Sequence, residues 1–265
     1  MPEGHTIHRY ARLHRDLLGG RTLGVSSPQG RFSDGARLLD GRTLREVYPY
    51  GKHLWYSFGD GLYLHVHLGL YGKFAAGEGP PPEPRGALRL RMVGEGIWLD
   101  LRGPTACEVH TPPEREALLA RLGPDPLLPN SDDRLAYGRI TRSRAAVGKL
   151  LMDQSVVAGI GNIYRAELLF RAGISPERPG NAVTEDEWNP LWADTKRLML
   201  AGVRAGRIVT TRPEHRERKT GRASRHDAFY VYGREGLPCR LCGTAILKAE
   251  MAARKVFWCP TCQPG

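Results

Sequence analysis

The sequence near the carboxyl terminus reads Cys239-Arg240-Leu241-Cys242, then sixteen residues, then Cys259-Pro260-Thr261-Cys262. Two CxxC pairs at this separation are typical of a four-cysteine zinc site at the ends of a short hairpin. Four thiolates fill a tetrahedral coordination shell and leave no position for water, so the zinc is expected to be structural. The spacing therefore predicts one structural zinc ion, bound by Cys239, Cys242, Cys259 and Cys262.

Composition narrows the class of partner. The 265 residues carry 39 Lys and Arg against 28 Asp and Glu, which gives a formal net charge of +11. An excess of this size, dominated by arginine, favours a polyanionic partner because the guanidinium group matches the geometry of phosphate. A basic protein without such a partner is the alternative.

Cysteine usage and hydropathy argue against a disulfide-bonded protein and against a membrane protein. Four of the five cysteines fall in the zinc motif, which favours metal binding in a reducing compartment over disulfide bonds. The fifth, Cys107, is expected to be a small buried apolar residue. The chain has no apolar run of about 18 residues and no signal peptide, so we expect a cytoplasmic protein that does not bind membranes.

The amino-terminal half, residues 1–121, is expected to be a β-sandwich with a flanking helix. Apolar spacing predicts this helix over Thr6–Leu18, with Thr6 as its cap. The stretch Gly77–Pro84 holds four prolines and is expected to be a loop. Short β-branched and aromatic runs predict strands at Val47–Phe58, Leu62–Val66, Ala87–Met92 and Ile97–Leu101.

Helical signals replace strand signals in the carboxyl-terminal half, so the fold class is expected to be α+β. Residues 122–134 are rich in proline and polar residues and are interpreted as a linker. Residues 135–225 are expected to form a helical domain, and residues 226–265 the four-cysteine zinc finger. The helices are expected at Arg144–Gln154, Ile163–Arg171 and Thr184–Ala205.

The basic stretch Arg212–Arg225 shows no apolar periodicity. One interpretation is a flexible, solvated loop. The other is a loop that becomes ordered on nucleic acid.

The first residues, Met1-Pro2-Glu3-Gly4, carry a candidate nucleophile. Proline after the initiator methionine allows that methionine to be removed, which leaves a free secondary amine. An α-amino group has a pKa of about 7.7–8.0, so part of it is unprotonated and nucleophilic at neutral pH. Its condensation with an aldehyde carbon gives an iminium ion, which is an electron sink for elimination. Glu3 is a candidate for moving protons, and a chance Met-Pro-Glu start is the alternative.

The stretch from residue 65 to residue 72 reads His-Val-His-Leu-Gly-Leu-Tyr-Gly and holds two kinds of candidate. His65 and His67, two residues apart in a strand, point to one face and are candidate metal ligands, but no third ligand is evident in the sequence. Leu70 and Tyr71, in a glycine-flanked loop, have the character of a wedge that enters a base stack.

Three further polar residues are candidates, each with a simpler alternative. Lys52 follows Gly51 in the strand expected around it and, taken alone, is interpreted as an exposed strand charge. Asn162 starts a helix after a glycine-rich turn, where free N–H groups attract phosphate, and a helix cap is the alternative. Arg254 lies in the zinc-clamped hairpin, where it is held firmly enough to contact a phosphate, and a solvated surface charge is the alternative.

Taken together, these features resemble the bacterial Fpg/Nei DNA glycosylases, formamidopyrimidine-DNA glycosylase and endonuclease VIII. The similarity runs the length of the chain, and the Met-Pro-Glu-Gly-His-Thr start is most similar to the endonuclease VIII branch in its actinobacterial form. The motifs that carry the resemblance are Met1–Gly4, Gly51-Lys52, Leu122–Leu127, Leu150–Gln154, Gly159–Tyr164 and the terminal finger.

The resemblance implies a function and a partner. It implies a bifunctional DNA glycosylase and AP lyase of base excision repair, with a catalytic β-sandwich and a DNA-binding helix-two-turn-helix in residues 135–225. Such an enzyme removes oxidised pyrimidines and cleaves abasic sites by β,δ-elimination through a Schiff base at the amino-terminal proline. The expected partner is damaged double-stranded DNA, with single-stranded DNA as an alternative, and the enzyme is expected to be a monomer at the bacterial nucleoid.

The resemblance also implies roles for individual residues. Pro2 would attack C1′ of the damaged nucleoside, Glu3 would protonate and open the deoxyribose, and Lys52 would assist the first elimination. Asn162 and Arg254 would hold the phosphates that flank the flipped nucleotide, and Arg254 would also favour the second elimination. The remaining DNA contacts would come from Arg121 and from the plug residues Leu70 and Tyr71.

Two departures from the family pattern bear on the lesion. Gly69 stands where endonuclease VIII often has a larger polar residue, so the plug is expected to hold only two side chains. Residues 100–105 lack the Arg-Phe-Gly wedge of the purine-specific branch, which argues against 8-oxoguanine as the substrate. The alternative functions are a formamidopyrimidine or 8-oxoguanine glycosylase of the same family, and a non-catalytic zinc-containing protein that binds damaged DNA.

Overall fold

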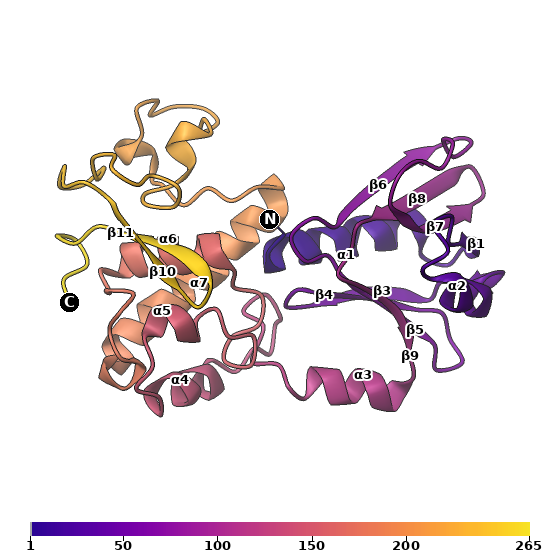
Figure 1. Ribbon diagram of the computed structural model, residues 1–265, viewed down its shortest axis with the longest axis horizontal. Coiled ribbons are helices and arrows are strands. Elements are labelled where there is room, and N and C mark those ends of the chain that lie inside the picture. The colour runs from indigo at the N-terminus through magenta and orange to yellow at the C-terminus, as the bar shows by residue number, and fades with distance from the viewer. Residues whose placement is uncertain (1) are drawn as a thin grey trace. The chain divides into compact units, whose positions relative to one another are not determined.

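The structure is a computed structural model that describes residues 2–265. The chain divides into two compact units: unit 1 ends at Arg121, and unit 2 runs from Leu122 to Gly265. Figure 1 shows the strands of unit 1 in indigo and purple, and the helices and terminal hairpin of unit 2 in colours from pink to yellow.

Unit 1 contains two antiparallel sheets. One has the strand order β2-β1-β7-β8-β6 and the other the order β3-β4-β5-β9 (Figure 1). The elements are α1 (Gly4–Leu18), β1 (Thr22–Ser26), α2 (Ser33–Leu39), β2 (Arg42–Thr43), β3 (Glu46–Tyr50), β4 (His53–Ser57), β5 (Tyr63–His67), β6 (Lys73–Glu78), β7 (Leu88–Gly94), β8 (Ile97–Arg102), β9 (Ala106–His110) and α3 (Pro112–Leu119).

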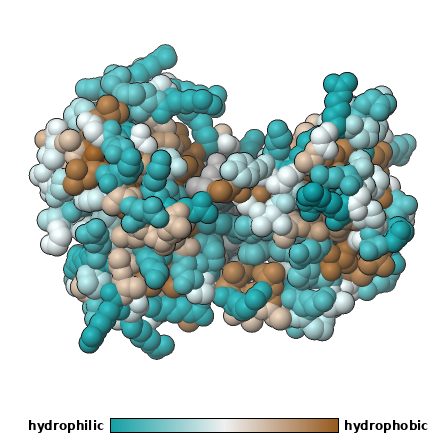
Figure 2. All heavy atoms as spheres, viewed as in Figure 1, coloured by the Kyte–Doolittle hydropathy of each residue, from teal (hydrophilic) through white to brown (hydrophobic). Residues whose placement is uncertain are grey.

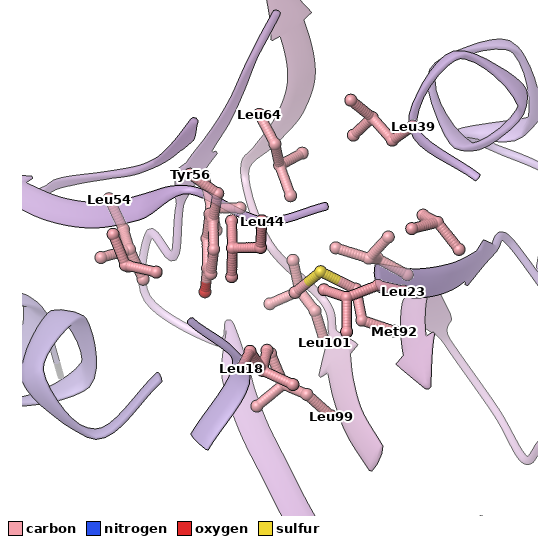
Figure 3. Packing of buried hydrophobic residues seen from close by; sticks show 14 of the residues in the cluster. Leu18, Leu23, Leu39, Leu44, Leu54, Tyr56, Leu64, Met92, Leu99 and Leu101 are labelled. Carbon is pink, nitrogen blue, oxygen red and sulfur yellow. The ribbon is translucent and has the colours of Figure 1, made fainter. Parts of the chain in front are cut away.

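The core of unit 1 lies between the two sheets. Alternate residues of the four-stranded sheet are apolar and buried, as period-two patterning requires when one face is packed. Figure 3 shows Leu54, Tyr56 and Leu64 of this sheet in one cluster with Met92 and Leu101 of the other. The helix α1 packs along β3 and β4. Together with the two packed sheets, it confirms the expected β-sandwich with a flanking helix.

Two local details of unit 1 differ from the sequence-based expectation. The first helix begins at Gly4 with Glu3 as its cap residue, so Thr6 lies inside the first turn and does not cap it. The stretch Gly77–Pro84 is a loop only from residue 79, because residues 77 and 78 still pair with β8. A Cβ at Gly77 would lie 2.8 Å from the Trp98 ring, so glycine allows the strand to pass that ring.

A third difference concerns the strand expected over Val47–Phe58. The structure has two strands here, β3 and β4, joined by a two-residue turn at Gly51 and Lys52. Gly51 has a φ of 55°, a conformation that glycine adopts without steric cost. Lys52 is therefore a turn residue and not a strand residue.

Unit 2 combines helices with a terminal hairpin, as expected. Thr184 caps the long helix α7 with a reciprocal capping box to Glu187. Apolar residues at helical spacing along α7 are buried in the core, and the Trp188 and Trp192 ring centroids lie 5.5 Å apart. The elements are α4 (Asp133–Thr141), α5 (Val147–Leu150), α6 (Asn162–Ala172), α7 (Glu185–Ala205), β10 (Leu247–Met251) and β11 (Arg254–Trp258), with single helical turns at Gly180–Ala182, Pro213–His215 and His226–Ala228.

The helix expected over Arg144–Gln154 is reduced to the single turn α5, and α4, which was not expected, precedes it. Tertiary contacts explain the short turn. The Gly148 N–H donates to the Pro176 carbonyl at 2.9 Å, and a Cβ on Gly148 would stand 2.9 Å from the same oxygen. The backbone of this segment therefore forms hydrogen bonds with residues 176–179 and does not continue as a longer helix.

The start of the stretch interpreted as a linker is packed. The Gly123 N–H donates to the Gln154 carbonyl at 2.8 Å, and the Pro124 carbonyl accepts from the Ala158 N–H at 3.0 Å. A Cβ at Gly123 would lie 2.4 Å from the Val156 carbonyl oxygen, so only glycine permits this approach. Residues 123–126 therefore lie against the turn that precedes α6.

Glu167 joins α6 to the segment that leads into the finger. Its buried carboxylate accepts the backbone N–H groups of Tyr230, Val231 and Tyr232, each at 2.8 Å, and the Thr210 hydroxyl. Burial raises the pKa of the Glu167 carboxyl, although these four hydrogen bonds favour its charged form. The helices and the finger are thereby built as one packed unit.

The four finger cysteines converge beside the β10–β11 hairpin. The Cys239 and Cys262 sulfurs lie 3.9 Å apart and the Cys242 and Cys259 sulfurs 3.4 Å apart, and all four lie within 4.8 Å of one another. A tetrahedral zinc site with Zn–S bonds of about 2.3 Å separates its sulfurs by about 3.8 Å. The sulfur positions therefore fit a single zinc ion.

The exposed side chains, polar and apolar, are the ones that a binding partner can contact. Figure 2 shows hydrophilic residues over most of the face in view, with hydrophobic residues in smaller patches. No helix among the described residues combines the length and the apolar character needed to cross a bilayer. Of the exposed large apolar side chains in residues 2–265, Tyr71 has the highest exposed fraction, 84%.

We expect one zinc per chain, and we expect its loss to unfold the finger. Structural zinc contributes about 10–16 kcal/mol in small zinc-finger peptides. Cys259→Ser should remove the zinc, and hydrogen exchange should show loss of amide protection in the β10–β11 hairpin. Cys107→Ala, which removes a buried thiol outside the cluster, is the matched control and should keep one zinc by elemental analysis. A metal-free protein with a protected hairpin would contradict this prediction.

Candidate active site and nucleic-acid interface

Pro2 and Glu3 lie at the amino-terminal end of α1. Glu3 has an extended backbone, and its carbonyl accepts the Thr6 N–H at 2.8 Å. Its side chain is completely buried and lies next to the first turn, where the partial positive charge of a helix favours a carboxylate. The predicted removal of Met1 concerns a residue outside the described part of the chain. The described residues thus place a buried acid next to the residue that would carry the free amine.

Lys52 lies at the tip of the β3–β4 hairpin. Tyr50 and His53 form the last pair before the turn, and a two-residue turn with glycine first is typical of type II′. Burial, followed by the positive charge of Lys52, lowers the pKa of His67 at the end of β5. Lys52 is therefore held by a short turn, within electrostatic reach of the strand that leads into the loop of Leu70 and Tyr71.

The loop between β5 and β6 projects two apolar side chains. Leu70 is 41% exposed and Tyr71 84% exposed. Gly69 has a φ of 64°, and a Cβ there would lie 1.9 Å from the Thr105 hydroxyl oxygen. A Cβ at Gly72 would likewise collide with backbone of the preceding turn. A side chain at position 69 would be strained by this backbone conformation, and Leu70 and Tyr71 are the large apolar side chains that the loop exposes.

Arg121 follows α3 at the end of unit 1. Its N–H donates to the Leu118 carbonyl at 3.2 Å, and its side chain is exposed. Burial, and then the charges of His67, Lys52 and Arg121, lower the pKa of His53 to about 4. Lys52 and Arg121 therefore lie within electrostatic reach of the same histidine.

Asn162 is the first residue of α6 and is almost completely buried. The cap position belongs to Gly161, so Asn162 is not the helix cap. Its side-chain N–H donates to the Lys255 carbonyl of β11 at 2.9 Å, and its side-chain oxygen accepts from Arg165. Asn162 thus connects the amino-terminal end of α6 to the finger hairpin.

Arg254 is the first residue of β11, directly before Lys255, and its side chain is exposed. The turn before it consists of Ala252 and Ala253, both with a φ of 54°. A two-residue turn of type I′ needs positive φ at both positions, and each costs a residue with a Cβ roughly 1–2 kcal/mol. The finger hairpin therefore holds Arg254 one residue from the strand carbonyl to which Asn162 donates.

Two further residues position this part of unit 2. The Gln154 side chain donates to the Ile160 carbonyl at 3.0 Å and accepts the Gly159 N–H at 2.9 Å, which closes the turn before α6. Arg165 is completely buried and donates to the Lys255 carbonyl at 3.1 Å. The sequence alone indicated no role for Gln154 and did not point to Arg165. The signal that could have identified Arg165 is its position three residues after Asn162, which places both side chains on one helix face.

The predicted residues divide between the two units. Within unit 2, the structure brings Asn162 to the hairpin of Arg254. Within unit 1, Lys52 and Arg121 both act on His53. The residues of unit 1 are Pro2, Glu3, Lys52, Leu70, Tyr71 and Arg121, and those of unit 2 are Asn162 and Arg254.

Three family models match successive parts of the chain. The formamidopyrimidine-DNA glycosylase N-terminal domain matches residues 1–107, and the formamidopyrimidine-DNA glycosylase H2TH domain matches residues 122–213. The zinc finger found in FPG and IleRS matches residues 236–265, where the four cysteines are positioned to bind one zinc ion.

Relatives match over the full length. The chain is 49% identical to "Endonuclease 8 1" of Mycobacterium bovis over 267 residues, which covers 99% of this chain and 100% of the relative. It is 35% identical to the "Formamidopyrimidine-DNA glycosylase" of Thermus thermophilus over 270 residues, with 99% and 98% covered.

Solved structures share the fold. The MutM (Fpg) protein of Thermus thermophilus has a TM-score of 0.80 and 32% identity, with 99% of this chain and 98% of that chain covered. A MutM in complex with DNA that contains carbocyclic 8-oxo-G has a TM-score of 0.84, with both chains fully covered, and at 24% identity it shows the fold alone. From the family models, the relatives and the shared fold together, the chain belongs to the Fpg/Nei family of DNA glycosylases.

Proposed function

We propose that the protein is a bifunctional DNA glycosylase and AP lyase that removes oxidised pyrimidines and cleaves abasic sites by β,δ-elimination. The observation that carries the proposal is the amino-terminal end of α1, where Pro2 is followed by a carboxyl group that is completely buried. A relative that is 49% identical and bears the name "Endonuclease 8 1" supports the pyrimidine-specific branch.

The proposed chemistry begins at the amine of Pro2. After removal of Met1, this amine attacks C1′ of the flipped nucleotide, the glycosidic bond breaks, and the base leaves with a proton. Glu3 protonates the ring oxygen of the deoxyribose, so the ring opens and an iminium ion forms between Pro2 and C1′. The iminium accepts the electron pair left when the C2′ proton is removed, and the 3′-phosphate then departs. Loss of the 5′-phosphate and hydrolysis of the iminium free the enzyme.

Polar residues would assist these steps from short, well-held turns. Lys52, at the tip of a two-residue turn, would assist the first elimination. Asn162 and Arg254 would hold the phosphates on either side of the flipped nucleotide, with Arg254 favouring the second elimination. Their connection through the Lys255 carbonyl supports a joint role, because it fixes one relative to the other. Arg121 would add a further phosphate contact.

Leu70 and Tyr71 would fill the space that the flipped nucleotide leaves. The connection from β8 to β9 supports a preference for pyrimidine lesions. Only residues 103–105 separate these strands, so there is no long loop to carry an Arg-Phe wedge. Arg102, at the end of β8, forms an ion pair with the buried Asp100 at 3.0 Å.

The same proposal assigns tasks to the segments of the chain. Residues 1–121 would carry the catalysis, residues 122–134 would connect, residues 135–225 would bind DNA through the helix-two-turn-helix, and residues 226–265 would form the finger. The partner would be damaged double-stranded DNA, with single-stranded DNA as an alternative. The enzyme would act as a monomer at the nucleoid in the bacterial cytoplasm.

Borohydride trapping on abasic DNA tests the nucleophile. Protein with a free Pro2 amine should give a covalent complex, because borohydride reduces the iminium ion to a stable amine. One extra residue before Pro2 should abolish trapping and strand cleavage while DNA binding is kept. A carboxyl-terminal extension of the same kind is the control and should trap normally. Undiminished cleavage by the blocked protein would refute this role, and no trapping by any form would favour the non-catalytic alternative.

Single-turnover rates on matched duplexes test the substrate class. Thymine glycol, 5-hydroxycytosine and abasic sites should be processed faster than 8-oxoguanine opposite cytosine, because the wedge that inspects the opposite base is missing. For the same reason, changing the opposite base should alter the rates little. If 8-oxoguanine opposite cytosine is excised fastest, the chain acts as a purine-specific member of the family.

Substitution of Leu70 and Tyr71 by alanine tests the plug. Stacking of an aromatic side chain on a base contributes about 1–3 kcal/mol, so excision from duplex DNA should slow by roughly 5- to 150-fold. Leu38→Ala, which truncates a leucine that is 51% exposed on α2, is the matched control and should leave the rate unchanged. Cleavage of single-stranded abasic DNA should depend far less on the plug, and an equal loss on both substrates would argue against it.

A further inference from the structure

The outer face of the sheet β3-β4-β5-β9, opposite the sandwich core, gathers several histidines. The strand register sets Trp55, His65 and Glu108 side by side on neighbouring strands. His110 follows Glu108 by two residues and so points to the same face, as does His53 beside Trp55. We call these five residues the histidine face.

Three ligand groups of the histidine face converge. The Glu108 carboxylate oxygen lies 3.2 Å from Nε2 of His110 and 4.0 Å from Nδ1 of His65. One ligand atom from each of the three residues falls within 4.8 Å of the other two. Bonds of about 2.0–2.2 Å to a tetrahedral zinc ion separate nitrogen and oxygen ligands by about 3.4 Å. The three groups are therefore spaced for one ion with little rearrangement.

Burial at His65 gives a second, independent indication. His65 is 3% exposed, and its Nδ1 has no hydrogen-bond partner among residues 2–265. Leaving a buried polar nitrogen without a partner costs free energy, and an ion between Nδ1 of His65 and the Glu108 carboxylate 4.0 Å away would satisfy it. The other ring nitrogen, Nε2, lies 2.8 Å from Nδ1 of His53. Hydrogen bonding at the far nitrogen is the arrangement that orients a metal-binding histidine.

We propose that His65, Glu108 and His110 bind a divalent first-row transition-metal ion, of the class that zinc represents, at a second site separate from the four-cysteine finger. Two imidazoles and one carboxylate suit zinc and its neighbours in the series better than calcium or magnesium. With three protein ligands, a fourth coordination position stays open to solvent beside Glu108, whose side chain is 60% exposed.

The charges around the site permit a cation. The guanidinium of Arg115 lies over the Tyr48 and Tyr63 rings at 4.9 and 5.2 Å from their centroids, and 6.0 Å from the Trp55 ring. It is thus engaged by aromatic faces instead of by Glu108. Glu114, at the start of α3, adds negative charge within electrostatic reach of His110.

Another group of potential ligands in unit 2 provides a comparison. Glu217, His226 and Asp227 also place ligand atoms within 4.8 Å of one another. There, however, His226 is exposed and forms an ion pair with Glu217 at 3.3 Å, and Asp227 accepts from Ser224 and from backbone N–H. None of these ligand atoms is buried and unpaired in the way that His65 is.

Cobalt(II) titration of protein with a zinc-loaded finger tests the proposal. Wild-type protein should bind one additional cobalt per chain, with visible d–d absorption and without the thiolate-to-cobalt charge-transfer band of cysteine ligands. Added zinc should displace this cobalt. Glu108→Gln and His110→Ala should each weaken binding by at least tenfold. His53→Ala, which removes the supporting hydrogen bond together with the ring that stacks on His65, should weaken it by roughly 10- to 100-fold.

His226→Ala is the matched control and should leave the additional cobalt in place. Circular dichroism and the zinc content of the finger show that each variant is folded, and neither measurement depends on glycosylase activity. The proposal is overturned if wild-type protein binds no additional cobalt, or if binding survives both Glu108→Gln and His110→Ala. It is also overturned if His226→Ala abolishes the binding.

Discussion

The alternation of side chains along β4, β5 and β9 is the constraint on which both the core of unit 1 and its outer face depend. Leu54, Leu64 and Val66 point inward and fill the sandwich core. The residues between them point outward, so His53 and His65 share the opposite face. A slip of one residue in the register would turn the histidines toward the sandwich core and the leucines toward the outer face, so the packing of the core fixes the positions of the outer groups.

Short turns then place the candidate DNA-contacting residues of unit 1 at the ends of these strands. A two-residue turn gives Lys52 little freedom relative to β3 and β4. At Gly69 the positive φ and the nearby Thr105 hydroxyl disfavour a side chain, and the next two residues, Leu70 and Tyr71, are exposed. Few side chains are tolerated at the glycine of each turn. The backbone there is therefore restricted, and the exposed residues next to the glycine are held in defined positions.

In unit 2, buried polar groups hold the candidate DNA-contacting residues in position. Arg165 and Glu167 are completely buried on α6 and are hydrogen bonded to the hairpin and to the segment before it. Desolvating such groups is costly, so they add specificity of arrangement more than net stability. They fix the finger against α6, and with it the residues Asn162 and Arg254. A structural zinc and a buried polar network thus support one surface together.

The sequence by itself determined the family through motifs that resemble those of known members. It also determined the zinc ligands, the α+β class and the helices α6 and α7, because local signals such as CxxC spacing and apolar periodicity carry them. It also located residues such as Leu70 and Tyr71 in an exposed loop. Only the tertiary structure decided that α5 is a single turn, since hydrogen bonds to residues 176–179 compete with the helix there. Likewise, only the pairing of β5 with β9 brings Glu108 and His110 to His65, because contacts between distant strands leave no periodic signal in the chain.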